Sequence, residues 1–163
     1  MVTVVLTVLF SGCGYSLVGG GYLDENVTQV AVELFENKSS ESRAGISFTN
    51  ELIREIQTKT DTEVVDVAKS TRKISGTIKA ITFATLSRSN TETVVERQVT
   101  AVMDVKLVGP DGGIIWSVKD FSANESYQVS SNTVGDEANK REAVDKIALR
   151  SAERIVSQMM SNF

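Results

Sequence analysis

Three carboxylates in the second half of the sequence, Asp104, Asp120 and Glu125, are of the residue type that can hydrolyse a glycosidic bond. Such hydrolysis needs two carboxyl groups held on opposite sides of the bond that breaks. All three residues occupy polar positions in segments where polar and apolar residues alternate, a pattern typical of solvated strand faces. We therefore expect no paired-carboxylate site in this chain.

The chain of 163 residues contains no histidine and one cysteine, Cys13. The missing imidazole excludes Ser-His-Asp and Cys-His catalysis and any zinc site that uses histidine. A single thiol cannot form an internal disulfide or a metal site built from several thiolates. The formal net charge of −4 argues against nucleic-acid binding. We expect a protein that is not an enzyme and that needs no metal and no cofactor.

The surroundings of Cys13 indicate a membrane anchor. Residues 1–10 are uncharged and mostly apolar, and this run is shorter than the roughly 20 residues that span a bilayer. It suits the apolar region of a signal peptide. Ser11 and Gly12 then place small side chains before the cysteine, which resembles a bacterial lipobox. The alternative is a buried first strand with an incidental cysteine.

We therefore expect a lipoprotein signal peptide over residues 1–12 and a covalent lipid on Cys13. Residues 13–21 then form the lipidated N-terminus and a spacer that ends in three glycines. Because Gly14 follows the cysteine, similarity to other bacterial lipoproteins implies export to the outer membrane. The remaining residues, 22–163, have the composition of one globular domain.

The hydrophobic periodicity predicts which elements position these residues. Alternating apolar residues indicate strands, and apolar residues spaced three or four apart indicate helices. We expect strands over Gln29–Phe35, Glu63–Val67, Lys73–Ser87, Arg97–Val108 and Ile114–Val129, and helices over Arg43–Lys59 and Asp136–Met160. This order, β-α-β-β-β-β-α, predicts an α+β fold with two helices packed on one face of a single, mostly antiparallel mixed sheet. The other face of the sheet must then be solvated or covered by a partner.

Three details refine the expected sheet. The apolar phase of the strand from Lys73 slips by one residue near Ala80, which indicates a β-bulge. Residues 109–113, Gly-Pro-Asp-Gly-Gly, form a turn that joins the last two strands as a hairpin. In the return strand Ile114, Trp116 and Val118 are expected on one face, with Trp116 in the core.

Four segments share their order and spacing with a known family. They are Cys13-Gly14-Tyr15-Ser16-Leu17, the strand and turn Val30–Ser39, the helical segment Phe48–Ile56, and the terminal helix with Arg141, Ala143, Ala148 and Ile155-Val156. Together they resemble the LptE family of lipopolysaccharide-assembly lipoproteins. Glu33 stands where that family usually has proline, which adds a backbone donor to the first strand.

The resemblance implies a protein without enzymatic activity. It implies an outer-membrane lipoprotein, held on the periplasmic side by its lipid, that plugs the β-barrel LptD, assists its assembly and contacts lipopolysaccharide on its way to the cell surface. The alternative is another anchored periplasmic binding lipoprotein, such as an activator of a cell-wall synthase or a component of a secretion channel.

Four basic residues are candidates for contact with the phosphates of lipopolysaccharide: Arg88, Lys79, Arg72 and Lys73. Guanidinium and ammonium groups suit phosphate oxygens. Arg88 is the best candidate because it lies beside a polar hairpin tip, Ser87–Thr91. The alternative is that all four charges belong to a solvated strand face.

The lipobox interpretation predicts that the native protein is cleaved after Gly12 and carries acyl chains on Cys13. Intact mass spectrometry of the protein extracted from membranes measures both changes. A native form that begins at Met1 and has an unmodified thiol would contradict the prediction.

Overall fold

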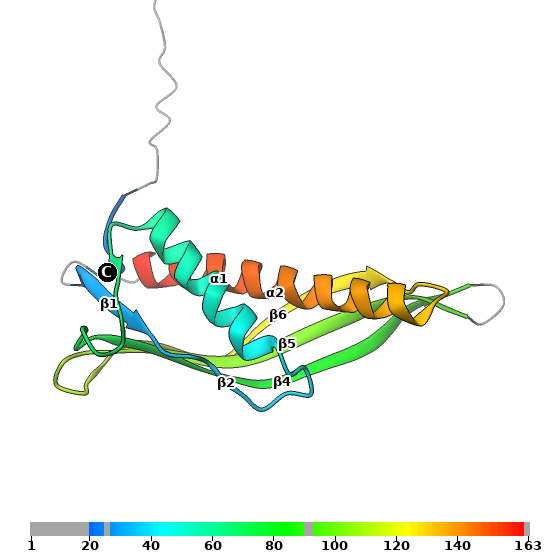
Figure 1. The fold of residues 1–163 in the computed structure, drawn as a ribbon, viewed down its shortest axis with the longest axis horizontal. Coiled ribbons are helices and arrows are strands. Elements are labelled where there is room, and N and C mark those ends of the chain that lie inside the picture. Colours follow the sequence, from blue (N-terminus) through cyan, green and yellow to red (C-terminus); the bar gives the residue numbers. More distant parts are fainter. Residues whose placement is uncertain (1–19, 25–26, 90–92, 162–163) are drawn as a thin grey trace, which may run out of the picture.

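The computed structural model describes residues 20–24, 27–89 and 93–161. The expected signal peptide, Cys13 and most of the spacer lie outside the described residues, as do Asn90 and Thr91 of the hairpin tip. In the described part, two helices lie on one face of one mixed sheet (Figure 1). This confirms the predicted α+β class and its order of elements.

Six strands and two helices make up the described part. They are β1 (Gln29–Val32), β2 (Glu36–Asn37), α1 (Ala44–Lys59), β3 (Glu63–Val64), β4 (Lys73–Arg88), β5 (Val94–Val108), β6 (Ile114–Gln128) and α2 (Thr133–Ser161). The sheet order is β3-β1-β4-β5-β6, and β2 pairs with β4 farther along. The parallel pairs involve the short strands, whereas β4, β5 and β6 are antiparallel. The first predicted strand, Gln29–Phe35, is shorter in the structure, where β1 ends at Val32 and the short β2 follows at Glu36–Asn37.

The predicted bulge in β4 is present. Ile78 pairs with Met103 and Ala80 pairs with Val102, so that Lys79 is the extra residue. Because side chains alternate between the faces of a strand, one extra residue reverses the alternation. Ile78 and Ile81 therefore both point into the core, where they are 0% and 6% exposed.

A second register shift corrects the prediction for the start of β6. Leu107 pairs with Trp116, and Val108 pairs with Ile114, which leaves Ile115 as an extra residue. Trp116 lies in the core as predicted and is 6% exposed, but Ile114 is 63% exposed. The expected common face for Ile114 and Trp116 is wrong because alternation across a bulge changes phase.

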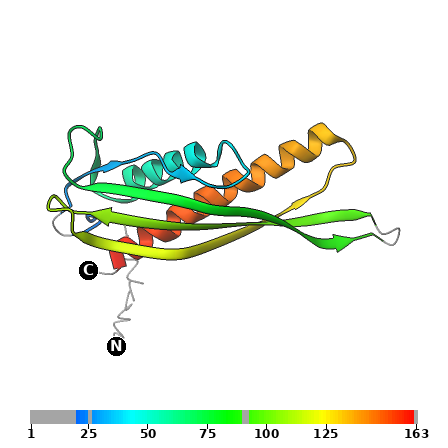
Figure 2. The same cartoon turned by 90° about the horizontal axis from the view of Figure 1, so that it is seen from below.

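The helices bury their apolar stripes against the long strands. Figure 2 shows α2 crossing the strands obliquely, and the end of the β4–β5 hairpin lies beyond the N-terminus of the helix. At 1.5 Å per residue, a helix of 29 residues is about 43 Å long. Its buried residues are Ala143, Val144, Ile147, Ala148, Ser151, Ala152, Ile155, Val156 and Met159. Neither helix combines the length and apolar character needed to cross a membrane, as far as the described residues go.

The segment between β1 and α1 is held by a close contact at Phe35. The Phe35 ring is 3% exposed and lies over Gly76 of β4, where a Cβ would be 2.5 Å from Cδ2 and Cζ. On the helix side, a Cβ on Gly45 would be 2.8 Å from the Phe35 carbonyl oxygen. The Phe35 N–H donates to the hydroxyl oxygen of Thr49 at 2.9 Å. Two glycines therefore allow α1, Phe35 and β4 to pack together.

Gly76→Ala should destabilise the fold by roughly 1–3 kcal/mol, because the new methyl group overpacks a buried ring. Replacing glycine in a strand would otherwise reduce the entropy of the unfolded chain and favour folding. Urea denaturation measures the difference in the free energy of unfolding. Ser75→Ala, one residue away on the opposite face, is the matched control and should be nearly neutral. An equal effect of the two substitutions would contradict this role of Gly76.

Candidate functional site: the helix-free face of the sheet

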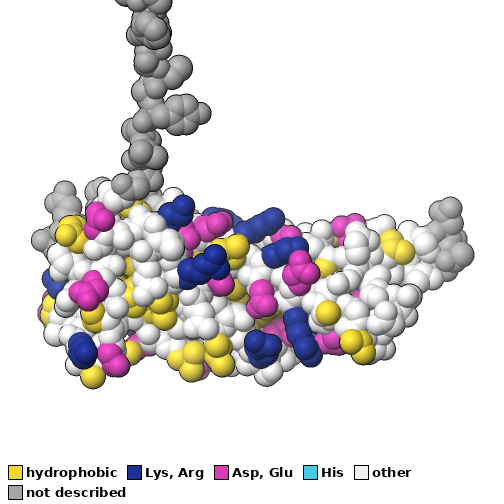
Figure 3. Space-filling model, turned by 45° about the horizontal axis from the view of Figure 1, so that its top comes forward, with side chains coloured by type: hydrophobic (Ala, Val, Ile, Leu, Met, Phe, Trp, Pro, Cys, Tyr) yellow, Lys and Arg dark blue, Asp and Glu magenta, His cyan; other side chains and the backbone are white. Residues whose placement is uncertain are grey.

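The sheet face turned away from the helices is largely polar. Side chains on this face alternate with core side chains along β4, β5 and β6, so the register places them in rows across the strands. The rows include Ser75–Lys106–Ser117, Thr77–Asp104, Val102–Ser122 and Thr82–Thr100–Asn124. Hydroxyl and amide groups thus outnumber charges on this face. Figure 3 shows a different side of the molecule, where acidic and basic side chains are interspersed without a patch of one sign.

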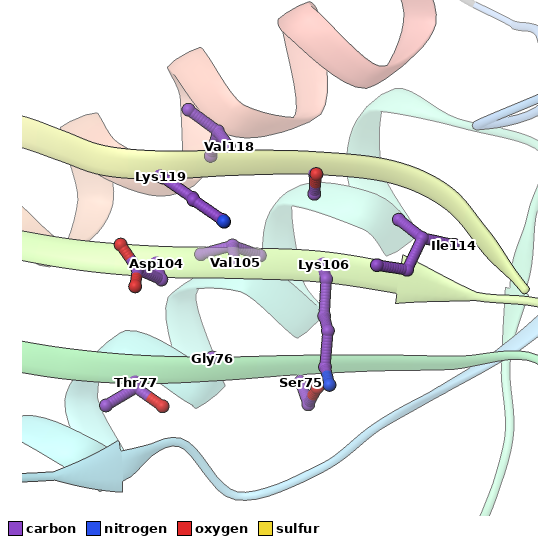
Figure 4. A pocket seen from close by; sticks show the side chains of 10 residues that line it. Ser75, Gly76, Thr77, Asp104, Val105, Lys106, Ile114, Val118 and Lys119 are labelled. Atoms are coloured by element: carbon purple, nitrogen blue, oxygen red, sulfur yellow. The ribbon is translucent and has the colours of Figure 1, made fainter. Parts of the chain in front are cut away.

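A shallow hollow of about 250 Å³ lies on this face (Figure 4). Its basic residues are Lys106 of β5 and Lys119 of β6. The hydroxyl groups of Ser75, Thr77 and Ser117 also line it. In Figure 4 the Lys106 side chain extends over β4 beside Ser75. Two ammonium groups and several hydroxyls around one hollow suit an anionic group such as a phosphate.

The sequence analysis did not select Lys106 and Lys119. Thirteen positions separate them in the chain, and they come together because β5 and β6 form a hairpin. The predicted turn at residues 109–113 was a usable signal, because it places the two strands side by side. The register across it was not readable, since β6 has extra residues relative to β5 at Ile115 and again between Val118 and Phe121.

Lys79 lies beside the hollow and is held by two carboxylates. Its Nζ donates to Oδ1 of Asp120 at 2.7 Å and to Oδ1 of Asp104 at 3.3 Å. These hydrogen bonds, the one to Asp120 first, raise the pKa of Lys79 above its ordinary value. The Asp120 N–H donates to Asp104 at 2.8 Å, which is the main cause of a lowered pKa at Asp104. A lipopolysaccharide phosphate would have to compete with both carboxylates for Lys79.

The backbone at Asp120 is unusual. Its φ is 52°, in the left-handed region that is uncommon for residues other than glycine. It lies at the register shift between the pairs Met103–Phe121 and Val105–Val118. Asp and Asn adopt this conformation more readily than most residues. The bulge turns the Asp120 N–H toward Asp104, and so creates the carboxylate pair that holds Lys79.

Of the other three predicted lipopolysaccharide contacts, Arg72 and Lys73 are neighbours at one end of β4 and Arg88 lies at the other. Lys73 forms an ion pair with Glu33 at 3.5 Å. Arg72 is half-buried beside β1, and its carbonyl accepts from Ala31 N at 3.0 Å. Arg88 is exposed at the opposite end of β4. Sixteen residues of extended chain separate Arg72 from Arg88, or roughly 50 Å. The structure therefore does not bring Arg72 and Lys73 together with Arg88 in one site.

The structure also separates the three carboxylates considered for hydrolysis. Asp104 and Asp120 share Lys79 on the helix-free face. Glu125 instead forms an ion pair with Arg150 of α2, on the helix side. Among the described residues, no cluster of three or more acidic or thiol side chains is placed to hold a metal ion.

The comparisons with known proteins agree with this fold. The family profile "LptE: Lipopolysaccharide-assembly" matches residues 27–159. Lipoprotein B from Nitrosomonas europaea is similar in structure, with a TM-score of 0.62, 18% identity, and coverage of 89% of this chain and 87% of that chain.

The rare lipoprotein B from Shewanella oneidensis is similar with a TM-score of 0.58 and 16% identity, over 82% of this chain and 95% of that chain. At this identity the two structures show a shared fold. No protein with a curated function matches the sequence. Because the family profile covers most of the sequence, the chain belongs to the LptE family of lipopolysaccharide assembly.

Proposed function

We propose that this chain is an outer-membrane lipoprotein that associates with the β-barrel LptD and takes part in the transport of lipopolysaccharide to the cell surface. The lipid on Cys13 would hold it at the periplasmic side of the membrane. The observation that carries this proposal is the polar, helix-free face of three long strands. Membership of the LptE family indicates that the process is lipopolysaccharide assembly.

The helix-free face suits the interior of an outer-membrane barrel. The lumen of such barrels is polar, and their apolar residues face the lipid. The rows Ser75–Lys106–Ser117 and Thr82–Thr100–Asn124 offer hydrogen-bonding groups to such a lumen. A protein that filled a barrel with an apolar face would meet polar walls and leave their groups unpaired.

We further propose that the hollow between Lys106 and Lys119 contacts a phosphate of lipopolysaccharide. Neither lysine takes part in the salt bridges formed within the described residues. Asp104 lies in the same hollow, but its carboxylate already accepts from Lys79 and from Asp120. Lys106 and Lys119 are therefore better placed than Lys79 to bind an added anion. Arg88 remains a second candidate at the hairpin end.

The same proposal assigns the protein no catalytic activity, no metal and no cofactor besides the covalent lipid. It also assigns it no nucleic-acid partner, in line with the acidic net charge of −4. Its action would consist of binding, positioning and plugging.

Membrane extraction tests the partner. The full-length lipidated chain, tagged at its C-terminus and solubilised from outer membranes in mild detergent, should retain LptD as a large β-barrel protein. Mass spectrometry identifies what is retained. A peptidoglycan synthase or a secretion channel in place of the barrel would contradict the proposal and would favour a different anchored lipoprotein.

The double substitution Lys106→Glu/Lys119→Glu should weaken lipopolysaccharide binding by about tenfold or more, since each charge-assisted hydrogen bond is worth about 1.5–3 kcal/mol. Fluorescence titration at two salt concentrations measures the change. Lys69→Glu/Arg141→Glu makes the same change in net charge at exposed positions away from the hollow and should have a much smaller effect. Arg88→Glu tests the hairpin end separately. If only Arg88→Glu weakens binding, the hollow is not the contact.

A further inference from the structure

The two edges of the sheet are covered to different extents. Along the outer edge of β6, side chains of α2 bond to the strand's carbonyl groups. Asn139 Nδ2 donates to the carbonyl of Gln128 at 2.8 Å, and Arg154 Nη1 donates to the carbonyl of Ser122 at 3.2 Å. The helix thus occupies acceptors that an added strand would need.

The opposite edge, along β4, is covered over its first half alone. Backbone N–H groups of Ala31, Glu33 and Lys38 donate at 2.9–3.0 Å to three carbonyls along this edge, those of Arg72 just before β4 and of Ile74 and Ile78 within it. These donors lie in β1 or directly after β1 and β2, and each of the two strands pairs with two residues of β4. Beyond Ile78, no described segment continues along this edge.

The register identifies the backbone groups that are left unpaired. Val129 N–H donates to the carbonyl of Val95 in β5, so the odd-numbered residues of β5 direct their backbone groups toward β6. In β4, Ile81, Phe83 and Thr85 lie opposite the odd-numbered residues Ala101, Val99 and Arg97 of β5. Their N–H and C=O groups therefore point away from β5, toward the open edge.

Two backbone hydrogen bonds support the same alternation. Ile74 and Ile78 also lie opposite odd-numbered residues of β5, Leu107 and Met103. The carbonyls of Ile74 and Ile78 accept from Glu33 and Lys38 on the β1–β2 side. The outward-facing backbone groups of β4 thus form one continuous edge. The segments around β1 and β2 hydrogen-bond to this edge as far as Ile78.

The open part of this edge lies between register shifts of β4 at Lys79 and Leu86, and within it the other usual protections against strand pairing are few. Residues 80–87, Ala-Ile-Thr-Phe-Ala-Thr-Leu-Ser, contain no charge and no proline. Exposed edges are normally protected by charged side chains, proline, bulges or a covering element. Thr82, Ala84 and Thr85 are exposed, and Leu86 is 49% exposed. Small or uncharged side chains therefore leave the backbone accessible to another strand.

We propose that β4 from Ile81 to Thr85 is a docking edge for one extended, uncharged segment of the outer-membrane barrel partner. The inference rests on the proposed association with LptD. Two arguments favour this occupant. The edge continues the one on which β1 and β2 already add as short extended segments, so a third segment would follow the same geometry. Residues 80–87 themselves carry no charged side chain that could pair with a charged segment, which favours an uncharged one. Main-chain hydrogen bonds would provide the affinity, as in other strand additions.

Proline scanning of the two edges tests the proposal. Thr85→Pro removes an N–H that faces the open edge and leaves the pairing with β5 intact. Ser126→Pro is the control, because Ser126 is exposed and by the same alternation directs its N–H to the outer edge of β6. In full-length lipidated protein, Thr85→Pro should lower the amount of barrel retained by about tenfold, and Ser126→Pro should leave it near the wild-type amount.

Hydrogen exchange of the wild-type protein provides a measurement that does not depend on any variant folding. In the complex with the barrel, the amides of Ile81, Phe83 and Thr85 should exchange at least tenfold more slowly than in the isolated chain. The amides of Thr82 and Ala84 already bond to β5 and should change little. This alternation is specific to an added strand.

Each outcome decides the proposal. Suppose that the wild-type chain retains LptD, that the amide exchange rates are the same in the complex and in the isolated chain, and that Thr85→Pro retains as much barrel as the wild type. The docking edge is then overturned, and the proposed function remains. If the wild-type chain retains no barrel, both are overturned. The same amides could instead be protected in the isolated chain and lose this protection on dilution. That result would assign the edge to a second copy of the chain and would overturn the barrel segment as its occupant.

Discussion

The packing of Phe35 between two glycines is the constraint on which the arrangement of layers depends. Its ring covers Gly76 of β4, its carbonyl approaches Gly45 of α1, and its N–H bonds to Thr49. Thr49 also donates its hydroxyl proton to the carbonyl of Gly45 at 2.7 Å. One residue thus fixes the distance between the first helix and the sheet. It also sets where β1 ends and β2 begins, and therefore how far the chain covers the edge of β4.

The division into a core face and a polar face follows from alternation corrected by bulges. Without the extra residue at Lys79, Ile81 would face solvent and Ala80 would face the helices. The bulge also places the Lys79 ammonium group beside Asp104 and Asp120. The same local irregularity therefore maintains the core and positions charge on the opposite face. This coupling explains why the strands can remain long without losing the phase of their apolar residues.

Periodicity in the sequence predicted the two helices, the three long strands, the hairpin turn and the bulge near Ala80, because each depends on neighbours within a few residues. It did not predict that Ile114 is exposed, since that depends on the register between β5 and β6. The pairing of Lys79 was equally inaccessible, because Asp104 and Asp120 lie 25 and 41 positions away in the chain. For the same reason the sequence analysis selected basic residues along one strand, whereas the hollow combines Lys106 and Lys119 from two strands.

Charge placement along β4 bears on how selective an exposed edge can be. A long uncharged edge pairs with many segments, which makes it a risk for aggregation. In β4 the uncharged stretch is short, since Lys79 precedes it and Arg88 follows it. A longer partner strand would run alongside charged residues at both ends, where pairing is less favourable for an apolar segment. The charges therefore limit the pairing to the residues between them. Because a one-residue slip would reverse the faces of an added strand, a short edge also restricts its register. An edge of this kind suits pairing with one specific strand better than the repeated addition of strands that leads to aggregation.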